Sequence, residues 1–228
     1  MGSIEMGHSR EAMNTKAAVL FRGPIRPDVD SVLENVRMLR KSLFDLEVAH
    51  TTYLATWTLP QETLARLAPA FDNLIVLNPL DQSALETELD FAPGVWNPVN
   101  AFRQYFMCQT ALTSIAADDC FTHIVHSRTD AAIEFVDRDA WFNDGYCTVH
   151  INDDHPASFI NDQFAVGPRE TMKAAWSYGS RDRLKELLRQ SVRPESVLQD
   201  MLDMSGIVPT AAPLTRWELN ATRHAIPA

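Results

Sequence analysis

The sequence predicts an α/β fold in which a mostly parallel sheet is flanked by helices, and three observations support this prediction. With 228 residues, 46% of them hydrophobic and 22% charged, the chain has the composition of an ordinary folded domain. In its first half, short apolar runs alternate with helix-like segments at a spacing of roughly 25 to 30 residues, as in parallel strands joined by crossover helices. Polar side chains follow several of these runs. We expect residues 1–15 to form a mobile tail and residues 16–228 to fold as a single domain.

The first half of the chain contains four predicted strands and three predicted helices. Apolar runs predict the strands over residues 16–21, 47–57, 74–77 and 121–125. Apolar side chains spaced three and four residues apart predict the helices over residues 31–43, 60–71 and 99–117. Ser31 and Glu34 have the spacing of a capping box at the start of the first helix. Residues 80–97 show no long period, so we expect a loop with about one helical turn that covers a site.

The second half has a different pattern. Short strands are predicted over residues 147–151 and 164–166, with a turn between them. Helices are predicted over residues 169–176, 181–190 and 195–204, and an extended piece over residues 214–219 is expected to return to a sheet. No internal repeat is present in the sequence.

Charge and apolar patterning exclude several classes of protein. Lys and Arg total 20 against 30 Asp and Glu, and a net charge of −10 repels nucleic acid unless basic residues cluster locally. The longest apolar run, residues 17–21, is far below the roughly 20 residues that span a bilayer. The three cysteines, Cys108, Cys120 and Cys147, form no Cys-x-x-Cys pair and are expected to be reduced core thiols. We therefore expect a cytoplasmic protein with no nucleic-acid partner.

Polar side chains at the strand ends point to a phosphate-containing ligand. The chain has no Gly-x-Gly-x-x-Gly and no Gly-Lys-Ser/Thr, so any phosphate must be held by side chains or by a metal ion. Four predicted strands are followed by polar groups, in residues 22–26, 56–57, 78 and 128–130. Each group alone has an ordinary structural explanation as a solvated loop residue, a packing residue or a turn former. Because parallel strands share one carboxyl edge, the groups should meet there and suit a nucleoside diphosphate.

Five short motifs then resemble a known family. They are Phe21-Arg22-Gly23-Pro24-Ile25, Leu54-Ala55-Thr56-Trp57, Asn100-Ala101-Phe102-Arg103-Gln104, Ser127-Arg128-Thr129-Asp130 and Asn161-Asp162-Gln163-Phe164-Ala165-Val166-Gly167. In this order they resemble the WavE-type lipopolysaccharide synthesis proteins, which are bacterial glycosyltransferases of the GT-A class. The resemblance covers residues 17–205 and departs at Ala55, where Ser would be expected.

The resemblance implies a GT-A-like domain that transfers a sugar from a nucleotide-sugar donor to a saccharide or lipid-linked acceptor during surface polysaccharide biosynthesis. It implies a donor site formed by Arg22, Gly23, Pro24, Thr56, Trp57, Asn100, Arg103 and Arg128, with Asp130 as a catalytic and metal-binding residue. Arg128-Thr129-Asp130 stands where other GT-A enzymes have Asp-x-Asp, so a Mg²⁺ or Mn²⁺ ion would depend on the single carboxylate of Asp130. Without an ion, Arg128, Arg103 or Arg22 would neutralise the departing diphosphate.

Inverting transfer also requires a carboxylate to take the proton of the acceptor hydroxyl. Asp162 is the first candidate, because it precedes a predicted strand in the half of the chain expected to face the acceptor. Asp153, Asp154 and Glu195 are the alternatives, although a turn and a helix start also explain them.

Two functions of other classes stay open. His150, Asp153, Asp154 and His155 would suit a divalent-metal hydrolase, although their spacing matches no known ligand signature. A non-catalytic scaffold that binds a nucleotide or a carbohydrate is consistent with the missing second carboxylate.

Two further groups of side chains have both a structural and a functional interpretation. Arg181, Lys185 and Arg189 form a basic stripe that is either solvated or in contact with a saccharide acceptor or the inner membrane surface. Trp176, Tyr178 and Trp217 are either core residues or stacking platforms for sugar rings. His123 and His126 should point to opposite faces of a strand and act structurally.

Overall fold

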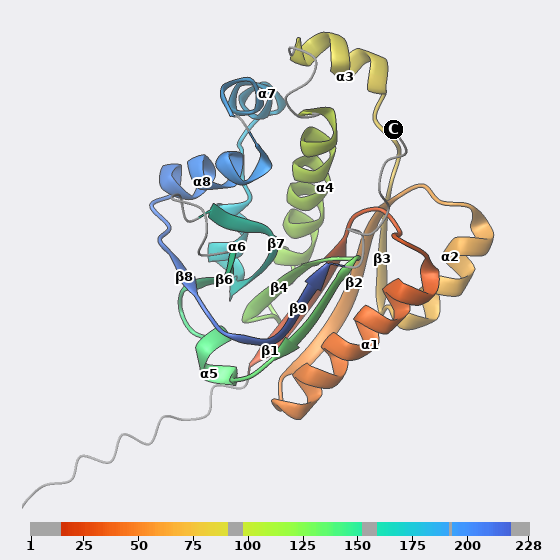
Figure 1. Cartoon of the computed structure of the whole chain (residues 1–228), viewed down its shortest axis with the longest axis vertical. Helices are drawn as coiled ribbons and strands as arrows, with labels where there is room; N and C mark the ends of the chain where they lie inside the picture. Colours follow the sequence, from red (N-terminus) through yellow and green to blue (C-terminus); the bar gives the residue numbers. More distant parts are fainter. Residues whose placement is uncertain (1–14, 91–97, 152–158, 192, 220–228) are drawn as a thin grey trace, which may run out of the picture.

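A seven-stranded sheet runs through the computed structural model, which describes residues 15–90, 98–151, 159–191 and 193–219 (Figure 1). Its strand order is β3-β2-β1-β4-β7-β6-β8. The strands are β1 (Lys16–Arg22), β2 (Ala49–Trp57), β3 (Asn73–Leu77), β4 (His123–Arg128), β6 (Tyr146–Ile151), β7 (Phe159–Pro168) and β8 (Pro209–Ala211). β1 to β4 are mutually parallel, and β7 runs antiparallel to its neighbours β4 and β6. The predicted α/β class with a mostly parallel sheet is confirmed.

Helices cover both faces of this sheet. They are α1 (Val29–Asp45), α2 (Gln61–Leu67), α3 (Gln82–Leu89), α4 (Pro98–Ala116), α5 (Arg138–Trp141), α6 (Arg169–Ala175), α7 (Arg181–Gln190) and α8 (Pro194–Met204), with a 3₁₀ turn, η1, at Ala68–Ala70. α1 lies on one face, and α4, α6, α7 and α8 gather on the other (Figure 1). None of the helices in the described ranges is long and apolar enough to cross a membrane.

The alternation of side chains along β1 produces a core on each face. Ala17, Val19 and Phe21 pack into the core that contains α1, whereas Ala18 and Leu20 pack into the core that contains α4. This follows from the two-residue period of a strand. Because Arg22 has the same parity as Leu20, its side chain emerges on the α4 side.

The start of α1 differs from the prediction. Asp28, not Ser31, is the N-cap, and its carboxylate accepts a hydrogen bond from the Ser31 backbone N–H at 2.8 Å. The N-cap therefore lies three residues before the predicted one. Pro27 precedes the cap, and an aspartate in extended conformation is as good a cap as serine.

Some elements of the structure differ from the predicted ones. Residues 82–89 form a two-turn helix, α3, where mostly loop was expected; Asp81 caps it. β5 (Ala131–Phe135) was not predicted, and it pairs with β9 (Leu214–Leu219) in a separate two-stranded sheet. The extended piece predicted at residues 214–219 is β9 and returns to a sheet as expected, in this small two-stranded one. β3 is an edge strand, in which Leu74 and Val76 are 39% and 42% exposed.

Candidate functional site at the carboxyl edge of the sheet

The loops after β1 and β4 are hydrogen-bonded to each other. The Thr129 backbone N–H donates to the Arg22 carbonyl at 3.1 Å, and the Thr129 hydroxyl donates to the Pro24 carbonyl at 2.6 Å. On the other side, the Gly23 N–H donates to the carbonyl of Ala55 in β2 at 3.2 Å. The carboxyl ends of β1, β2 and β4 are therefore joined by backbone contacts, as the parallel register of these strands requires.

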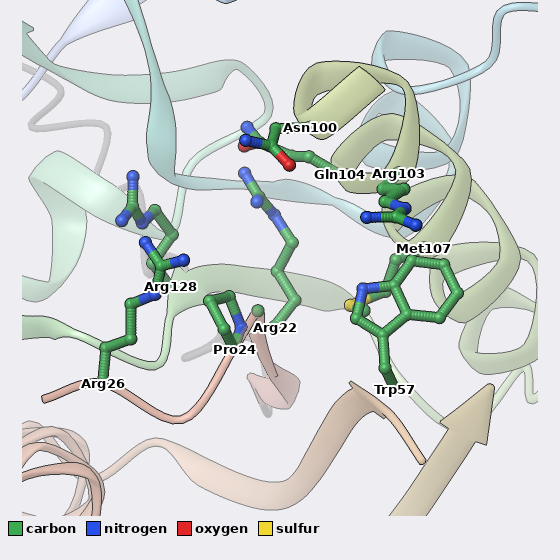
Figure 2. A pocket seen from close by; sticks show the side chains of 10 residues that line it. Arg22, Pro24, Arg26, Trp57, Asn100, Arg103, Gln104, Met107 and Arg128 are labelled. Atoms are coloured by element: carbon green, nitrogen blue, oxygen red, sulfur yellow. The ribbon is translucent and has the colours of Figure 1, made fainter. Parts of the chain in front are cut away.

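A pocket of about 300 Å³ opens at this edge. It is lined by Arg22, Gly23, Pro24 and Arg26 from the end of β1 and its loop, Trp57 from β2, Asn100, Arg103, Gln104 and Met107 from α4, and Arg128 from β4. Figure 2 shows Arg22 rising in the middle, with Arg26 and Arg128 on one side and Trp57, Arg103 and Met107 on the other. Of the described lining residues, four are arginines and none is acidic. A chain of net charge −10 thus concentrates positive charge here.

Arg22 is a buried cation that donates hydrogen bonds to two uncharged acceptors. It is 2% exposed. Its Nε donates to His126 Nε2 at 2.6 Å, and its Nη2 donates to the backbone carbonyl of Asp162 at 2.5 Å. Its guanidinium also lies 5.5 Å from the centre of the Trp176 ring. A buried charge costs free energy unless an opposite charge compensates it, so this pocket favours an anionic ligand.

His126 is neutral, and in this form it accepts the hydrogen bond from Arg22. Burial, followed by the charges of Arg22 and Arg128, lowers the pKa of His126 well below its ordinary value. Because Nε2 accepts the hydrogen bond from Arg22, the ring proton lies on Nδ1. The Cys108 thiol lies beside the same guanidinium, and burial raises its pKa to about 12, so it stays protonated.

Arg128 and Asp130 form a two-bond ion pair at the end of β4. Arg128 Nε donates to Asp130 Oδ1 at 2.8 Å, and Nη2 donates to Oδ2 at 2.5 Å. The Asp130 side chain is 2% exposed, whereas that of Arg128 is 22% exposed and lines the pocket. Asp130 therefore orients Arg128 from behind and does not itself line the pocket.

No protein-family model matches the sequence, and no curated protein matches it. Among solved structures, the chain is similar to the catalytic domain of Drosophila beta1,4-galactosyltransferase 7 in complex with xylobiose, with a TM-score of 0.48 and 10% identity over 92% of this chain and 71% of that one. It is also similar to a mutant of that enzyme in complex with manganese, UDP-Gal and xylobiose, with a TM-score of 0.44 and 11% identity over 87% of this chain and 65% of that one. At this level of similarity, the residues of the pocket must carry any functional conclusion.

Most of the predicted donor-site residues line the pocket. Arg22, Gly23, Pro24, Trp57, Asn100, Arg103 and Arg128 are all at its wall. Thr56 is not, because successive strand residues point to opposite faces and its neighbour Trp57 takes the α4 side. The Thr56 hydroxyl is buried and has no hydrogen-bond partner among the described residues.

Asp162 lies next to the pocket through its contacts with two lining residues. Its carboxylate accepts a hydrogen bond from the Gln104 side-chain amide, and its backbone carbonyl accepts from Arg22. Asp162 is 3% exposed. Glu195, at the start of α8, is half-buried, and burial together with the charge of Asp162 raises the pKa of its carboxyl. Two of the four acidic residues considered as the base, Asp162 and Glu195, thus act on each other.

Sequence reasoning missed part of the α4 wall. One face of α4 lines the pocket, because the lining residues follow Asn100 by three, four and seven positions; they are Arg103, Gln104 and Met107. Continuing that face from Asn100 and Arg103 would have found Gln104 and Met107. The role of His126 could not be found this way, because it depends on the β1–β4 register.

The structure describes only part of the alternative metal site that the sequence predicted. Asp153, Asp154 and His155 lie outside the described residues, and His150 is described only by its backbone. Among the residues that the structure describes, no three His, Cys, Asp or Glu side chains gather as metal ligands would. Trp176 and Tyr178 are buried core residues, and the Trp217 side chain is not described.

His123 and His126 do point to opposite cores, against Phe142 and Trp176 respectively. Cys108 and Cys147 are buried, but Cys120 is exposed.

Proposed function

We propose that this chain is a glycosyltransferase of the GT-A type that binds a nucleotide-sugar in the arginine-lined pocket. The observation that carries the proposal is the set of four arginines, with no acidic residue among the described lining, at the carboxyl edge of a parallel sheet. Ligands of open α/β sheets bind at this edge. Guanidinium groups form paired hydrogen bonds with phosphate oxygens, and a nucleotide-sugar presents a diphosphate.

Trp57 gives the pocket a second kind of surface. Figure 2 shows its indole across the pocket from Arg26 and Arg128, near Met107. An aromatic face offers stacking to a base or a sugar ring, whereas the arginines suit phosphates. In this proposal the nucleoside lies toward Trp57 and the diphosphate lies toward Arg22, Arg26 and Arg128.

Transfer to the acceptor needs a leaving group and a base. The acceptor hydroxyl oxygen forms a bond to the anomeric carbon, while the bond from that carbon to the diphosphate oxygen breaks and the diphosphate leaves with the electron pair. The arginines stabilise this leaving group. In an inverting reaction the hydroxyl proton passes to a carboxylate, for which we propose Asp162, with Glu195 as the alternative.

The finer assignments rest on the five short motifs of the sequence. They favour a WavE-type enzyme of bacterial surface polysaccharide biosynthesis with a saccharide or lipid-linked acceptor. Cytoplasmic location and contact with the inner membrane surface stay predictions.

Binding of nucleotides tests the proposal directly. We expect UDP or GDP to raise the melting temperature of the full chain and to bind in calorimetry, and Arg22→Gln to weaken that binding by at least about tenfold, since it removes a charged hydrogen bond. Arg37→Gln is the matched control, because Arg37 is exposed on α1 and pairs with Glu34 away from the pocket. If UDP, GDP and CMP all fail to bind the wild-type chain, the proposal is wrong.

A non-catalytic scaffold is the second candidate, because Asp130 is held by Arg128 and does not line the pocket. Release of nucleotide from UDP- and GDP-sugars in the presence of saccharide acceptors separates the two. Nucleotide binding without any sugar transfer or donor hydrolysis would favour the scaffold.

A further inference from the structure

We infer that the pocket binds its nucleoside diphosphate without a divalent cation, using arginine side chains as the counter-ions. The inference rests on the proposed function, because it assumes a nucleoside diphosphate as the ligand. It states that side chains of this protein neutralise the charge of that ligand, and three observations support it.

The first observation is that the one carboxylate in the expected metal-binding position is already engaged. Both oxygens of Asp130 accept hydrogen bonds from the Arg128 guanidinium, at 2.8 and 2.5 Å. The Asp130 side chain is 2% exposed. An ion could reach it only if Arg128 moved away and left a buried charge unpaired, which is costly. The residues present at this position therefore do not fit a metal ion.

The second observation is the charge of the pocket wall. Arg22, Arg26 and Arg103 contribute three positive charges, and Arg128 contributes a fourth that its ion pair with Asp130 offsets. The described lining contributes no negative charge. Within the described part of the chain, no hydrogen bond or ion pair engages Arg26. The diphosphate of a nucleotide-sugar carries one negative charge on each phosphate, so the arginines exceed it. A divalent cation would add like charge to this wall and be repelled.

The third observation is that the other nearby carboxylates are poor replacements. The Asp162 carboxylate accepts a hydrogen bond from Gln104 and does not line the pocket. Glu195 is half-buried, and burial favours its neutral form. Neither is among the described residues that line the pocket, whereas hard divalent cations prefer several oxygen ligands.

The test measures UDP binding to the full chain by calorimetry, once with excess EDTA and once with Mn²⁺. We expect dissociation constants that agree within about twofold, since counter-ions of the protein already neutralise the diphosphate. Binding that is tenfold or more tighter with Mn²⁺ would overturn the inference and leave the proposed function standing. Absence of binding by UDP, GDP and CMP under both conditions would overturn the proposed function and the inference with it.

Two variants assign the effect to residues. Arg128→Ala should weaken UDP binding by about tenfold in EDTA, because it removes a charged phosphate contact. Asp130→Asn should weaken it less, and by the same factor with and without Mn²⁺, since Asp130 only orients Arg128. If Asp130→Asn instead removes an increment of affinity that appears only with Mn²⁺, Asp130 is a metal ligand and the inference is wrong. Arg37→Ala is the control, and circular dichroism checks folding.

Discussion

Arg22 shows how a buried cation can be kept in place without a carboxylate. Its acceptors are a neutral histidine nitrogen and a backbone carbonyl, and the Trp176 ring lies 5.5 Å away. Neutral acceptors fix the direction of the guanidinium but leave its charge available to a ligand. An Asp or Glu in place of His126 would compete with the ligand for that charge. The residue pair is therefore organised for binding an anion.

His126 also predicts a pH dependence of stability. Burial lowers the pKa of His126 in the folded chain below its ordinary value of 6.5, so the unfolded chain binds a proton first as the pH falls. The free energy of unfolding should thus be highest above pH 6.5 and decrease below it, by up to about 1.4 kcal/mol per pH unit for this one proton.

Urea unfolding at several pH values checks the effect of His126. His126→Gln keeps an acceptor for Arg22 but cannot titrate, so its stability should fall less steeply below pH 6.5. Burial also lowers the pKa of His123, so His123 contributes in the same direction. The pH dependence of stability that remains in His126→Gln should therefore decrease further in the double variant with His123→Gln. Parallel curves for wild type and His126→Gln would contradict the prediction.

The loop after β1 is the element that gives the pocket its shape. Gly23 has φ = +125°, a conformation that L side chains rarely adopt, and its N–H bonds to β2. A Cβ at this position would lie 3.4 Å from the Thr129 hydroxyl, which itself bonds to Pro24. Glycine therefore lets three segments meet at one point.

Gly23→Ala should lower the free energy of unfolding by about 1 to 3 kcal/mol, because the backbone conformation is strained for any residue with a side chain. It should also weaken UDP binding, since the strained loop carries Pro24 and Arg26. Gly206→Ala is the matched control: Gly206 has φ = +65°, and a Cβ there meets nothing within 4 Å. Both variants should lose stability, and only Gly23→Ala should lose affinity. Equal affinity in all three proteins would contradict the role of the loop.

The basic stripe on α7 forms ion pairs with α3 and within α7 itself. Lys185 pairs with Glu88 of α3 at 2.8 Å, Arg181 lies 3.9 Å from the same carboxylate, and Arg189 donates to the Glu88 carbonyl. The stripe therefore joins α7 to α3 and is not simply solvated. A contact with lipid or saccharide would have to compete with Glu88.

At the scale of the whole molecule, two cores share one sheet. β1 lies between β2 and β4 and sends alternate residues into each core, so neither core can form without it. The pocket lies at the carboxyl end of the same strand. Folding of the two faces and formation of the site should therefore be coupled.

Substitutions in the two cores test this coupling. Leu39→Ala in the α1 core and Leu112→Ala in the α4 core should each lower the free energy of unfolding by about 2 to 5 kcal/mol. Circular dichroism and tryptophan fluorescence should give the same urea midpoint in each variant, because Trp141 and Trp176 report on opposite cores. Two separate transitions would show that the chain does not unfold as one domain.

The sequence by itself determined the elements whose pattern is local. The apolar period predicted β1, β2, α4 and α7, and the shared carboxyl edge of parallel strands brought Arg22, Trp57 and Arg128 together as expected. These features depend on neighbours within one strand or one helix, and the right-handed connection of parallel strands leaves few arrangements open.

Only the tertiary structure decided which side chains face the pocket and which partners they have. Thr56 points away from the pocket, and the Asp130 carboxylate is paired with Arg128. His126 accepts a hydrogen bond from Arg22 because β1 and β4 are neighbours in this register. β5 also found its partner β9 about eighty residues away, a pairing that no local pattern indicates. The physical reason is that hydrogen bonds and ion pairs between distant segments depend on register and side-chain direction, which are determined only when the whole sheet is assembled.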